Sequence, residues 1–257
     1  MARFISQAIR KEAEKVFHNS NVSVIVPPHV GQNTSQVSNR IKHYLKLYKP
    51  RLIVLMVGCN NTWSFAESHI IRFLDSANPE TLRIKLLLTL DNFRLFKGLR
   101  YLYQRLINGA RLFSTKTYLK FISGHPEYVL EQTQIWAGSF TDVNKEAFRR
   151  LWKYDLRKII KEAKRHDAKV ILMTYHINPT NYLSVSDYVS MAQEQEVLLI
   201  RNDQSFEPLI RNETVNSFLL YDDWYPDKHW HPNKKGYAII AENIFEQIKN
   251  NKLLNPI

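Results

Sequence analysis

The apolar positions of the chain fall into two kinds of segment, which alternate along most of its length. Continuous apolar runs of strand length occupy residues 51–58, 169–175 and 197–200. Apolar residues at the three- and four-residue spacing of amphipathic helices occupy residues 35–48, 145–166, 185–195 and 233–249. Strands that are apolar on both faces and alternate with helices predict an α/β domain with a mostly parallel sheet.

Three further segments complete the expected architecture. Residues 4–18 have the spacing of an amphipathic helix, residues 21–26 form a β-rich run, and residues 79–113 are basic, aromatic and helical in pattern. The block 76–144 interrupts the alternation of strands and helices. We therefore expect a single domain over residues 1–257, with 76–144 as a helical insertion within it.

The composition is that of a chain with one sizeable hydrophobic core. It has 257 residues, of which 44% are hydrophobic. Its one cysteine, Cys59, excludes an intramolecular disulfide. The longest apolar run is LIVLMV, far short of a membrane span, and the N-terminal sequence MARFISQAIRKEAEKVF lacks the apolar region of a signal peptide. As written, the sequence predicts a soluble, cytoplasmic protein.

The charge of the chain is strongly basic and unevenly placed. The formal net charge is +12, and residues 79–122 hold nine Lys and Arg against two Asp and Glu. Such an excess is typical either of a solvated helix face or of a surface that contacts lipid headgroups or an acidic glycan. The sequence contains no zinc-finger, RNP-like or glycine-hinged basic motif, so we expect no nucleic-acid partner.

The turns that follow the predicted strands carry candidate oxyanion donors. In open parallel sheets, ligands bind beyond the carboxyl ends of the strands. Asn60 follows the 51–58 strand and offers a side-chain amide. Gly31 follows the preceding β-rich run, where a backbone N–H can approach the same point. Both groups are donors of the kind an oxyanion hole uses, although Gly and Asn are also ordinary turn residues.

The segment 227–237, DKHWHPNKKGY, places an acid and two histidines just before the last helix. Asp227 can orient His231 as a general base if the intervening residues form a turn, with Pro232 at the first helical position. Two alternatives stay open: surface loop histidines with Asp227 as a cap, or a zinc site built on the His-x-His pair. No further His or Cys cluster supplies another ligand, so we expect no metal and no cofactor.

Together, these blocks resemble those of the SGNH (GDSL-type) hydrolase family in order and spacing. The glycine block is matched by PPHVGQNTSQV, with Gly31 as one oxyanion donor, and the Gly-x-Asn-Asp block by LIVLMVGCNNTW, with Asn60 as the other. The histidine block is matched by DKHWHPNKKGY, with His231 as the general base and Asp227 as the nearest acid. The resemblance covers most of the chain and implies a flavodoxin-like, three-layer α/β/α fold.

Three departures separate the sequence from the family pattern. Lys228 stands where the family has the acid of Asp-x-x-His, so Asp227 comes one residue early, and Asn61 replaces the Asp of Gly-x-Asn-Asp. The Gly-Asp-Ser block that carries the family's nucleophile after the first strand has no match, and Ser6 lacks that context. We therefore assign no nucleophile and expect the first strand to be missing. The chain is then a fragment of a longer enzyme or a diverged, non-catalytic relative.

The function that the resemblance implies is that of a serine esterase acting on an acyl or O-acetyl ester, either a small molecule or an ester on a glycan. Because the nucleophile block is not found, the resemblance does not decide whether this chain is itself an enzyme. The alternative is a non-catalytic SGNH-like protein that binds an anionic surface, either lipid headgroups or an acidic glycan, through the basic insertion.

Overall fold

The computed structural model of the chain describes residues 23–25, 32–62, 65, 67–75, 79–90, six positions between 93 and 102, 144–177, 180–211, 219–220 and 231–254. These residues form a mixed α/β structure with a three-stranded parallel sheet and several helices. By its contacts, the chain divides into two compact units. Unit 1 comprises residues 1–28, 40–56 and 157–257, and unit 2 comprises residues 29–39 and 57–156.

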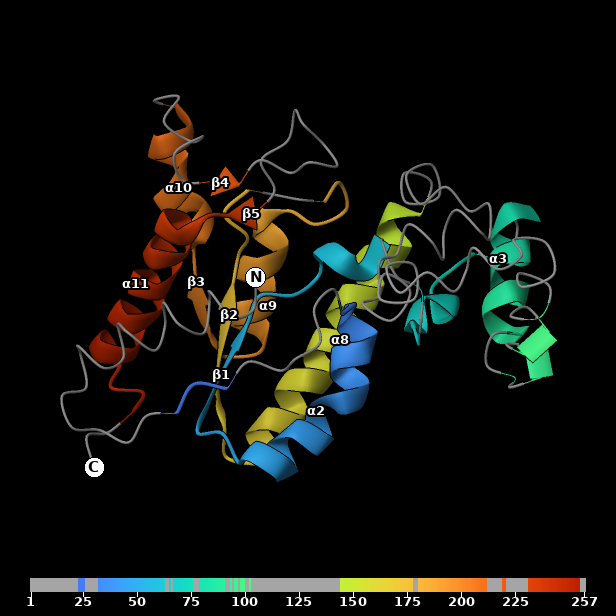
Figure 1. Cartoon of the computed structure of the whole chain (residues 1–257), viewed down its shortest axis with the longest axis horizontal. Helices are drawn as coiled ribbons and strands as arrows, with labels where there is room; N and C mark the ends of the chain where they lie inside the picture. The colour runs from blue at the N-terminus through green and yellow to red at the C-terminus, as the bar shows by residue number, and fades with distance from the viewer. Residues whose placement is uncertain are drawn as a thin grey trace. The chain divides into compact units, whose positions relative to one another are not determined.

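Unit 1 contains the parallel sheet, in the order β1-β2-β3 (Figure 1). Its strands are β1 (Leu52–Leu55), β2 (Lys169–Met173) and β3 (Leu198–Ile200). Leu52 pairs with Lys169 and Ile171 pairs with Leu198, so β2 is the central strand. All β2 side chains after the first are buried, as expected for a parallel strand that is covered on both faces. The prediction of three parallel strands at these positions is confirmed.

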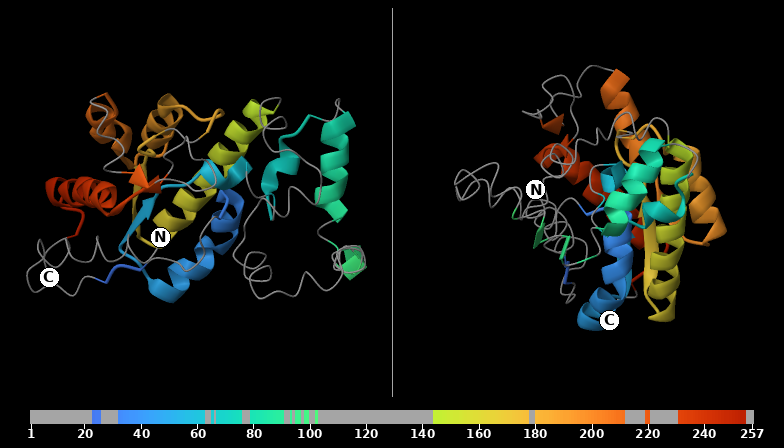
Figure 2. Two further views of the ribbon diagram at one scale, coloured as in Figure 1. Left: turned by 45° about the horizontal axis from the view of Figure 1, so that its top comes forward. Right: turned by 90° about the vertical axis from the view of Figure 1, so that its right-hand side faces the viewer.

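Helices α10 (Asn202–Arg211) and α11 (Lys234–Asn250) cover one face of this sheet. Figure 2 shows them in orange and red. Ile171 of β2 packs there with Phe206 of α10 and Ile244 of α11. Alternate β2 side chains point to the opposite face, where α9 (Val185–Glu194) contacts β2 and β3 (Figure 1). Full burial of each such apolar side chain stabilises the fold by about 1.5–3 kcal/mol.

Helix α11 begins at a polar cap. Asn233 is its N-cap, and the side-chain oxygen accepts hydrogen bonds from two backbone N–H groups of the first turn, at 2.9 and 3.2 Å. Pro232 lies in the short strand β5 (His231–Pro232), which pairs antiparallel with β4 (Leu219–Leu220). The expectation that Pro232 is the first helical residue is therefore wrong, because the asparagine supplies the cap and the proline stays extended before it.

Unit 2 shares two long helices with unit 1. Its elements are the first residues of α2 (Thr34–Tyr48), the first part of α8 (Lys145–Arg165), the 3₁₀ helices η1 (Cys59–Thr62) and η2 (His69–Arg72), and helix α3 (Pro79–Leu90). Phe148 of α8 is fully buried and packs against Phe65, with ring centroids 6.0 Å apart. The amphipathic pattern of residues 145–166 thus predicts α8 correctly, and its apolar stripe forms part of the core of this unit.

Several segments differ from the sequence-based expectation. Within the helix expected over 79–113, α3 ends at Leu90 and residues 95, 96, 98, 99 and 102 are helical again, so the described residues confirm helix over part of this range but not one continuous helix. Helix α10 was not predicted, and it contains Pro208, a residue that usually ends or kinks a helix. Residues 23–25, within the β-rich run, form neither helix nor strand. The helix expected over 4–18 lies outside the described residues.

Within the described ranges, no helix combines the length and the apolar character needed to cross a bilayer.

Candidate functional site

The turn that carries Asn60 is fixed by its backbone. It follows β1 and forms η1, in which Asn61 N–H donates to Gly58 O at 3.1 Å. Gly58 has a φ of 134°, a conformation that residues with a side chain rarely adopt. Fully buried Trp152 of α8 donates its Nε1–H to Val57 O at 3.0 Å, just before the turn. The glycine of Gly-x-Asn is therefore required by the backbone here.

The side-chain amide of Asn60 is held against the segment that the sequence predicts to supply the other oxyanion donor. Its Nδ2 donates a hydrogen bond to Gln32 O at 3.2 Å. Gln32 directly follows Gly31, which itself lies outside the described residues. An amide nitrogen carries two hydrogens, and the second finds no acceptor within the described part of the chain. Asn60 is half-buried, and among the described residues only one of its two amide hydrogens is engaged.

Asn61, the residue that departs from the Gly-x-Asn-Asp pattern, ties this turn to α2. Its side chain is completely buried, and Oδ1 accepts a hydrogen bond from Thr34 N (2.8 Å) and lies 3.0 Å from Thr34 Oγ1, whose single proton is closer to Asp155. Because a backbone N–H can only donate, the amide oxygen must face it. An uncharged acceptor is sufficient for this contact, so the substitution of Asn for Asp leaves the turn attached.

The start of α2 is closed by a reciprocal cap. Asn33 Oδ1 accepts a hydrogen bond from Gln36 N at 2.8 Å, and Gln36 Oε1 accepts one from Asn33 N at 3.1 Å. Such a capping box satisfies two backbone donors and fixes the first turn of a helix. It positions Thr34 and Ser35, both completely buried, with their hydroxyls toward α8.

Asp155 of α8 lies at the centre of a buried polar network. Its side chain is completely buried, and carboxylates are rarely buried without partners. Oδ2 accepts hydrogen bonds from Thr34 Oγ1 (2.8 Å) and Ser35 Oγ (2.6 Å), and Oδ1 lies 2.6 Å from His69 Nδ1. Hydrogen-bond partners on both oxygens compensate the carboxylate for the loss of water.

The network engages only one of the two ring nitrogens of His69. Since the carboxylate of Asp155 accepts, we assign the proton to Nδ1, which leaves the lone pair on Nε2. Nε2 has no hydrogen bond to any described residue, and the side chain is 16% exposed. The Tyr154 ring meets the imidazole edge-on, with centroids 5.6 Å apart. An imidazole held at Nδ1 by a carboxylate and open at Nε2 has the arrangement of a general base.

Ser35 is not placed to act as a nucleophile, although it lies beside this histidine and aspartate. Its Oγ donates to Asp155 Oδ2 and accepts a hydrogen bond from the His69 backbone N–H at 2.9 Å. A nucleophilic serine donates instead to an imidazole nitrogen and faces the substrate. The hydroxyl is completely buried. The cluster therefore contains the residue types of a catalytic triad without its connectivity.

The predicted base and its acid belong to the other unit. The backbone of His231 forms β5 in unit 1 and pairs with Leu220, whereas Asn60 and Gln32 belong to unit 2. Asp227 and the side chain of His231 lie outside the described residues. Their assignment as a general base and its orienting acid stays a prediction.

A second polar network lies in unit 1, where β2 and β3 end. Thr174 Oγ1 donates to Asp203 Oδ1 at 2.6 Å, and completely buried Asn202 donates to Thr174 O at 3.0 Å. Arg201 binds both oxygens of Asp203, at 2.6–3.2 Å. Burial raises the pKa of Asp203, but the hydrogen bonds from Arg201 and Thr174 outweigh it and hold that pKa below the ordinary 3.8. The last partner in this network is Arg201, whose guanidinium is permanently charged.

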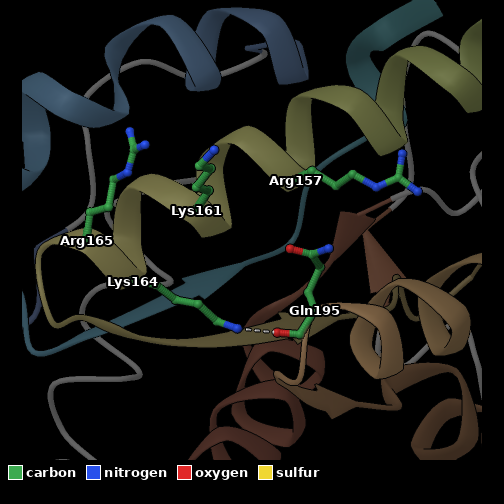
Figure 3. Close-up of a pocket in the computed structure, with 5 residues that line it drawn as sticks. All are labelled: Arg157, Lys161, Lys164, Arg165 and Gln195. Carbon is green, nitrogen blue, oxygen red and sulfur yellow. Dashed lines mark hydrogen bonds between the residues drawn. The ribbon is translucent and has the colours of Figure 1, made fainter.

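Unit 1 also has a shallow basic groove along α8 (Figure 3). It encloses about 550 Å³ and is lined by Arg157, Lys161, Lys164, Arg165 and Gln195. Glu194 binds the Arg157 guanidinium at 2.6 and 2.7 Å, which raises the pKa of that arginine. Lys164 donates to Gln195 O at 2.6 Å, and Arg165 pairs with Glu162. Most of the cationic groups in the groove are therefore already engaged.

In the described ranges, no group of three or more His, Cys, Asp or Glu side chains is arranged to hold a metal ion.

Comparisons with known protein families, with curated proteins and with solved structures found no match. The chemistry of the residues themselves is therefore the basis for any proposal.

The sequence-based reasoning missed Asp155 and His69. The helix over 145–166 was interpreted as one amphipathic element with a basic face, and no residue was singled out within it. The signal that could have found Asp155 is its position: it falls in the apolar stripe, between Trp152 and Ile159. A carboxylate in such a stripe needs buried partners. His69 stands in no recognisable motif, and its role follows only from the contact with Asp155.

Proposed function

We propose that this chain is an SGNH (GDSL-type) ester hydrolase, with a flavodoxin-like arrangement of its sheet and helices. One observation carries the proposal: the Asn60 amide donates to Gln32, the residue next to Gly31, and keeps a second N–H available. This contact supports two donors that converge on one point, as an oxyanion hole requires. The parallel sheet with helices on both faces is compatible with the fold that the proposal requires.

In the proposed mechanism, the ester carbonyl oxygen lies between the Asn60 side-chain N–H and the Gly31 backbone N–H. Negative charge builds on that oxygen as the carbonyl carbon is attacked, so both donors bind the transition state more strongly than the substrate. His231, oriented by Asp227, takes the proton of the attacking group. The substrate is an acyl or O-acetyl ester, either small or on a glycan. The proposal assigns no nucleophilic side chain.

The test is the turnover of p-nitrophenyl acetate by Asn60→Ala. Loss of one oxyanion donor typically lowers the rate by about 10²–10³. The matched control is Asn39→Ala, which removes an exposed asparagine of α2 in the same unit. Circular dichroism checks that both variants are folded. Unchanged turnover in a folded Asn60→Ala variant, or no turnover by the unmodified chain, would contradict the proposal.

A surface observation favours a second candidate function, which is binding to an anionic membrane. Nine large hydrophobic side chains are exposed among the described residues. Six of them lie close together in the sequence, in or near α3: Leu82, Leu86, Phe93, Leu95, Leu99 and Leu102. Residues 79–122 also carry nine Lys and Arg against two acids. Exposed apolar side chains among basic ones are the pattern of a segment that lies on anionic lipid.

Vesicle co-sedimentation tests this candidate. We expect binding to phosphatidylserine-containing vesicles, weaker binding in high salt, and weaker binding by Leu86→Asp, which puts a charge into the apolar surface. The control is Leu47→Asp in α2, because Leu47 and Leu86 are exposed to nearly the same extent, 58% and 59%. Equal effects of the two substitutions, or no preference for anionic vesicles, would remove this candidate.

A further inference from the structure

The buried network of unit 2 ends in an imidazole that the proposed roles of Asn60, Gly31 and His231 leave unused. We propose that His69, oriented by Asp155, is a general base that activates water for direct attack on an ester. By this route the chain hydrolyses esters without a nucleophilic side chain. The inference rests on the proposed function for its oxyanion donor, Asn60, and assigns the role of proton acceptor to His69 in place of His231.

The geometry of His69 is that of a fixed base. Its Nδ1 lies 2.6 Å from the completely buried Asp155 carboxylate, and its backbone N–H donates to Ser35 Oγ at 2.9 Å. The imidazole is thus held both through its ring and through its main chain. Among the described residues nothing binds Nε2, and the 16% exposure of the side chain gives water access to the residue.

The base and Asn61, the residue next to the oxyanion donor, belong to one continuous network. Asn61 binds Thr34, Thr34 Oγ1 donates to Asp155 Oδ2, and Asp155 Oδ1 binds His69. Asn60 is the neighbour of Asn61 within the same 3₁₀ turn. All of these residues belong to unit 2, so their relation does not depend on how the two units are placed. Asp155 acts in this network as a positioning residue.

The charged and titratable groups around the imidazole come from two elements. Asp155 of α8 faces Nδ1, and Tyr154 of α8 presents its ring. Arg72, on the same 3₁₀ helix as His69, donates to Tyr154 OH at 2.8 Å and lies over the tyrosine ring at 5.3 Å. The residues of α2 that face His69 contribute hydroxyl groups only. The aspartate stabilises the imidazolium that forms when Nε2 takes a proton.

The chemical step balances with water as the only co-reactant. The water oxygen forms a bond to the acyl carbon while Nε2 of His69 takes one of its protons. The carbonyl π electrons move to the oxygen, which the Asn60 amide stabilises. On collapse of this intermediate the bond to the leaving alcohol breaks, and the alkoxide takes the proton back from His69. The products are the carboxylic acid and the alcohol, and the histidine is regenerated.

The experiment follows p-nitrophenyl acetate hydrolysis by the full chain across pH, before and after treatment with a fluorophosphonate. We expect no acyl-enzyme burst, no loss of activity on treatment, and an acidic limb in the pH profile. His69→Gln is expected to lower the rate by about 10²–10⁴ and to remove that limb. The control is His166→Gln, which removes the histidine at the end of α8 that is bonded through Nδ1 to Glu162 O.

Three outcomes would overturn the inference. If fluorophosphonate abolishes turnover, a nucleophilic side chain carries the reaction. If folded His69→Gln keeps the rate and the acidic limb while Asn60→Ala loses turnover, the oxyanion donor stands and the base is another group; loss of the limb in His231→Gln would identify it. If Asn60→Ala and His69→Gln both turn over as the unmodified chain does, the proposed function fails together with the inference.

Discussion

Each unit of the chain contains a buried threonine bonded to an aspartate, and the two pairs end differently. In unit 2, Thr34 donates to Asp155, which then binds His69. In unit 1, Thr174 donates to Asp203, which then binds Arg201. The threonine–carboxylate bonds are nearly equal, at 2.8 and 2.6 Å. The difference lies in the last partner: a guanidinium that stays charged, or an imidazole with an open nitrogen.

This difference separates a structural network from one that can carry chemistry. The Arg201 ion pair is partly exposed, with side-chain accessibilities of 31% and 22%, and the guanidinium contacts both oxygens of the carboxylate. Asp155 is completely buried and depends on neutral hydroxyls and on His69. A buried carboxylate with a histidine as its partner controls the tautomer of that histidine, which an arginine does not require. Of the two networks, the one in unit 2 is therefore the one suited to proton transfer.

The largest effect should come from removing the two carboxylates one at a time. We expect Asp155→Ala to lower the free energy of unfolding by about 2–5 kcal/mol, because the buried Ser35 hydroxyl and the part-buried His69 ring lose their acceptor, at about 1–3 kcal/mol each. Asp203→Ala should cost only about 1 kcal/mol, since a partly exposed ion pair contributes little. Urea unfolding of both variants measures the difference. Equal losses would mean that the two networks are equivalent.

A smaller effect is expected at the glycine of the Asn60 turn. Gly58→Ala should destabilise the chain by about 1–3 kcal/mol, because alanine is strained at a φ of 134°. Gly98→Ala is the control: a Cβ there meets nothing within 4 Å. Its exposed helical position should make alanine neutral or stabilising, by up to about 1 kcal/mol. Thermal unfolding of the two variants tests this prediction. An unchanged melting temperature in Gly58→Ala would show that the turn is less constrained than its backbone conformation indicates.

Removing a helix N-cap side chain in either unit should lower the free energy of unfolding by about 1 kcal/mol. Asn33→Ala and Asn233→Ala each remove an N-cap side chain, one at α2 in unit 2 and one at α11 in unit 1. Asn33 is 1% exposed and takes part in a reciprocal pair with Gln36, whereas Asn233 is half-buried. We expect the larger loss of unfolding free energy at Asn33. A larger loss at Asn233 would place the more rigid helix start in unit 1.

The smallest effect is the pH dependence at Asp203. Its folded pKa is lowered from 3.8, so its contribution to stability is present above about pH 4 and is lost as the pH falls through the folded pKa. Asp203→Asn should therefore flatten the fall in unfolding free energy below pH 4 without changing its slope near neutrality. An unchanged acid slope in that variant would mean that the Arg201 pair contributes no stability.

The periodicity of the sequence predicts the elements but not the buried network. The apolar runs at 51–58, 169–175 and 197–200 predict the parallel sheet, because strands covered on both faces must be apolar. The place of Asn60 in a turn after a strand could be predicted as well, since Gly-x-Asn after a strand is a local pattern, whereas its role as an oxyanion donor stays a prediction. Asp155 and His69 are 86 positions apart and meet only in the folded chain. No spacing rule connects them.

The central claim is that Asp155 holds His69 with its proton on Nδ1 and its lone pair on Nε2. Long-range ¹H–¹⁵N NMR of the histidine rings tests this directly, with His69→Gln to assign the resonances and Asp155→Leu to remove the acceptor. The account predicts that the neutral His69 ring is the Nδ1–H tautomer and that this preference is lost in Asp155→Leu. A neutral His69 ring protonated on Nε2, or a folded Asp155→Leu variant with an unchanged His69 spectrum, would contradict it.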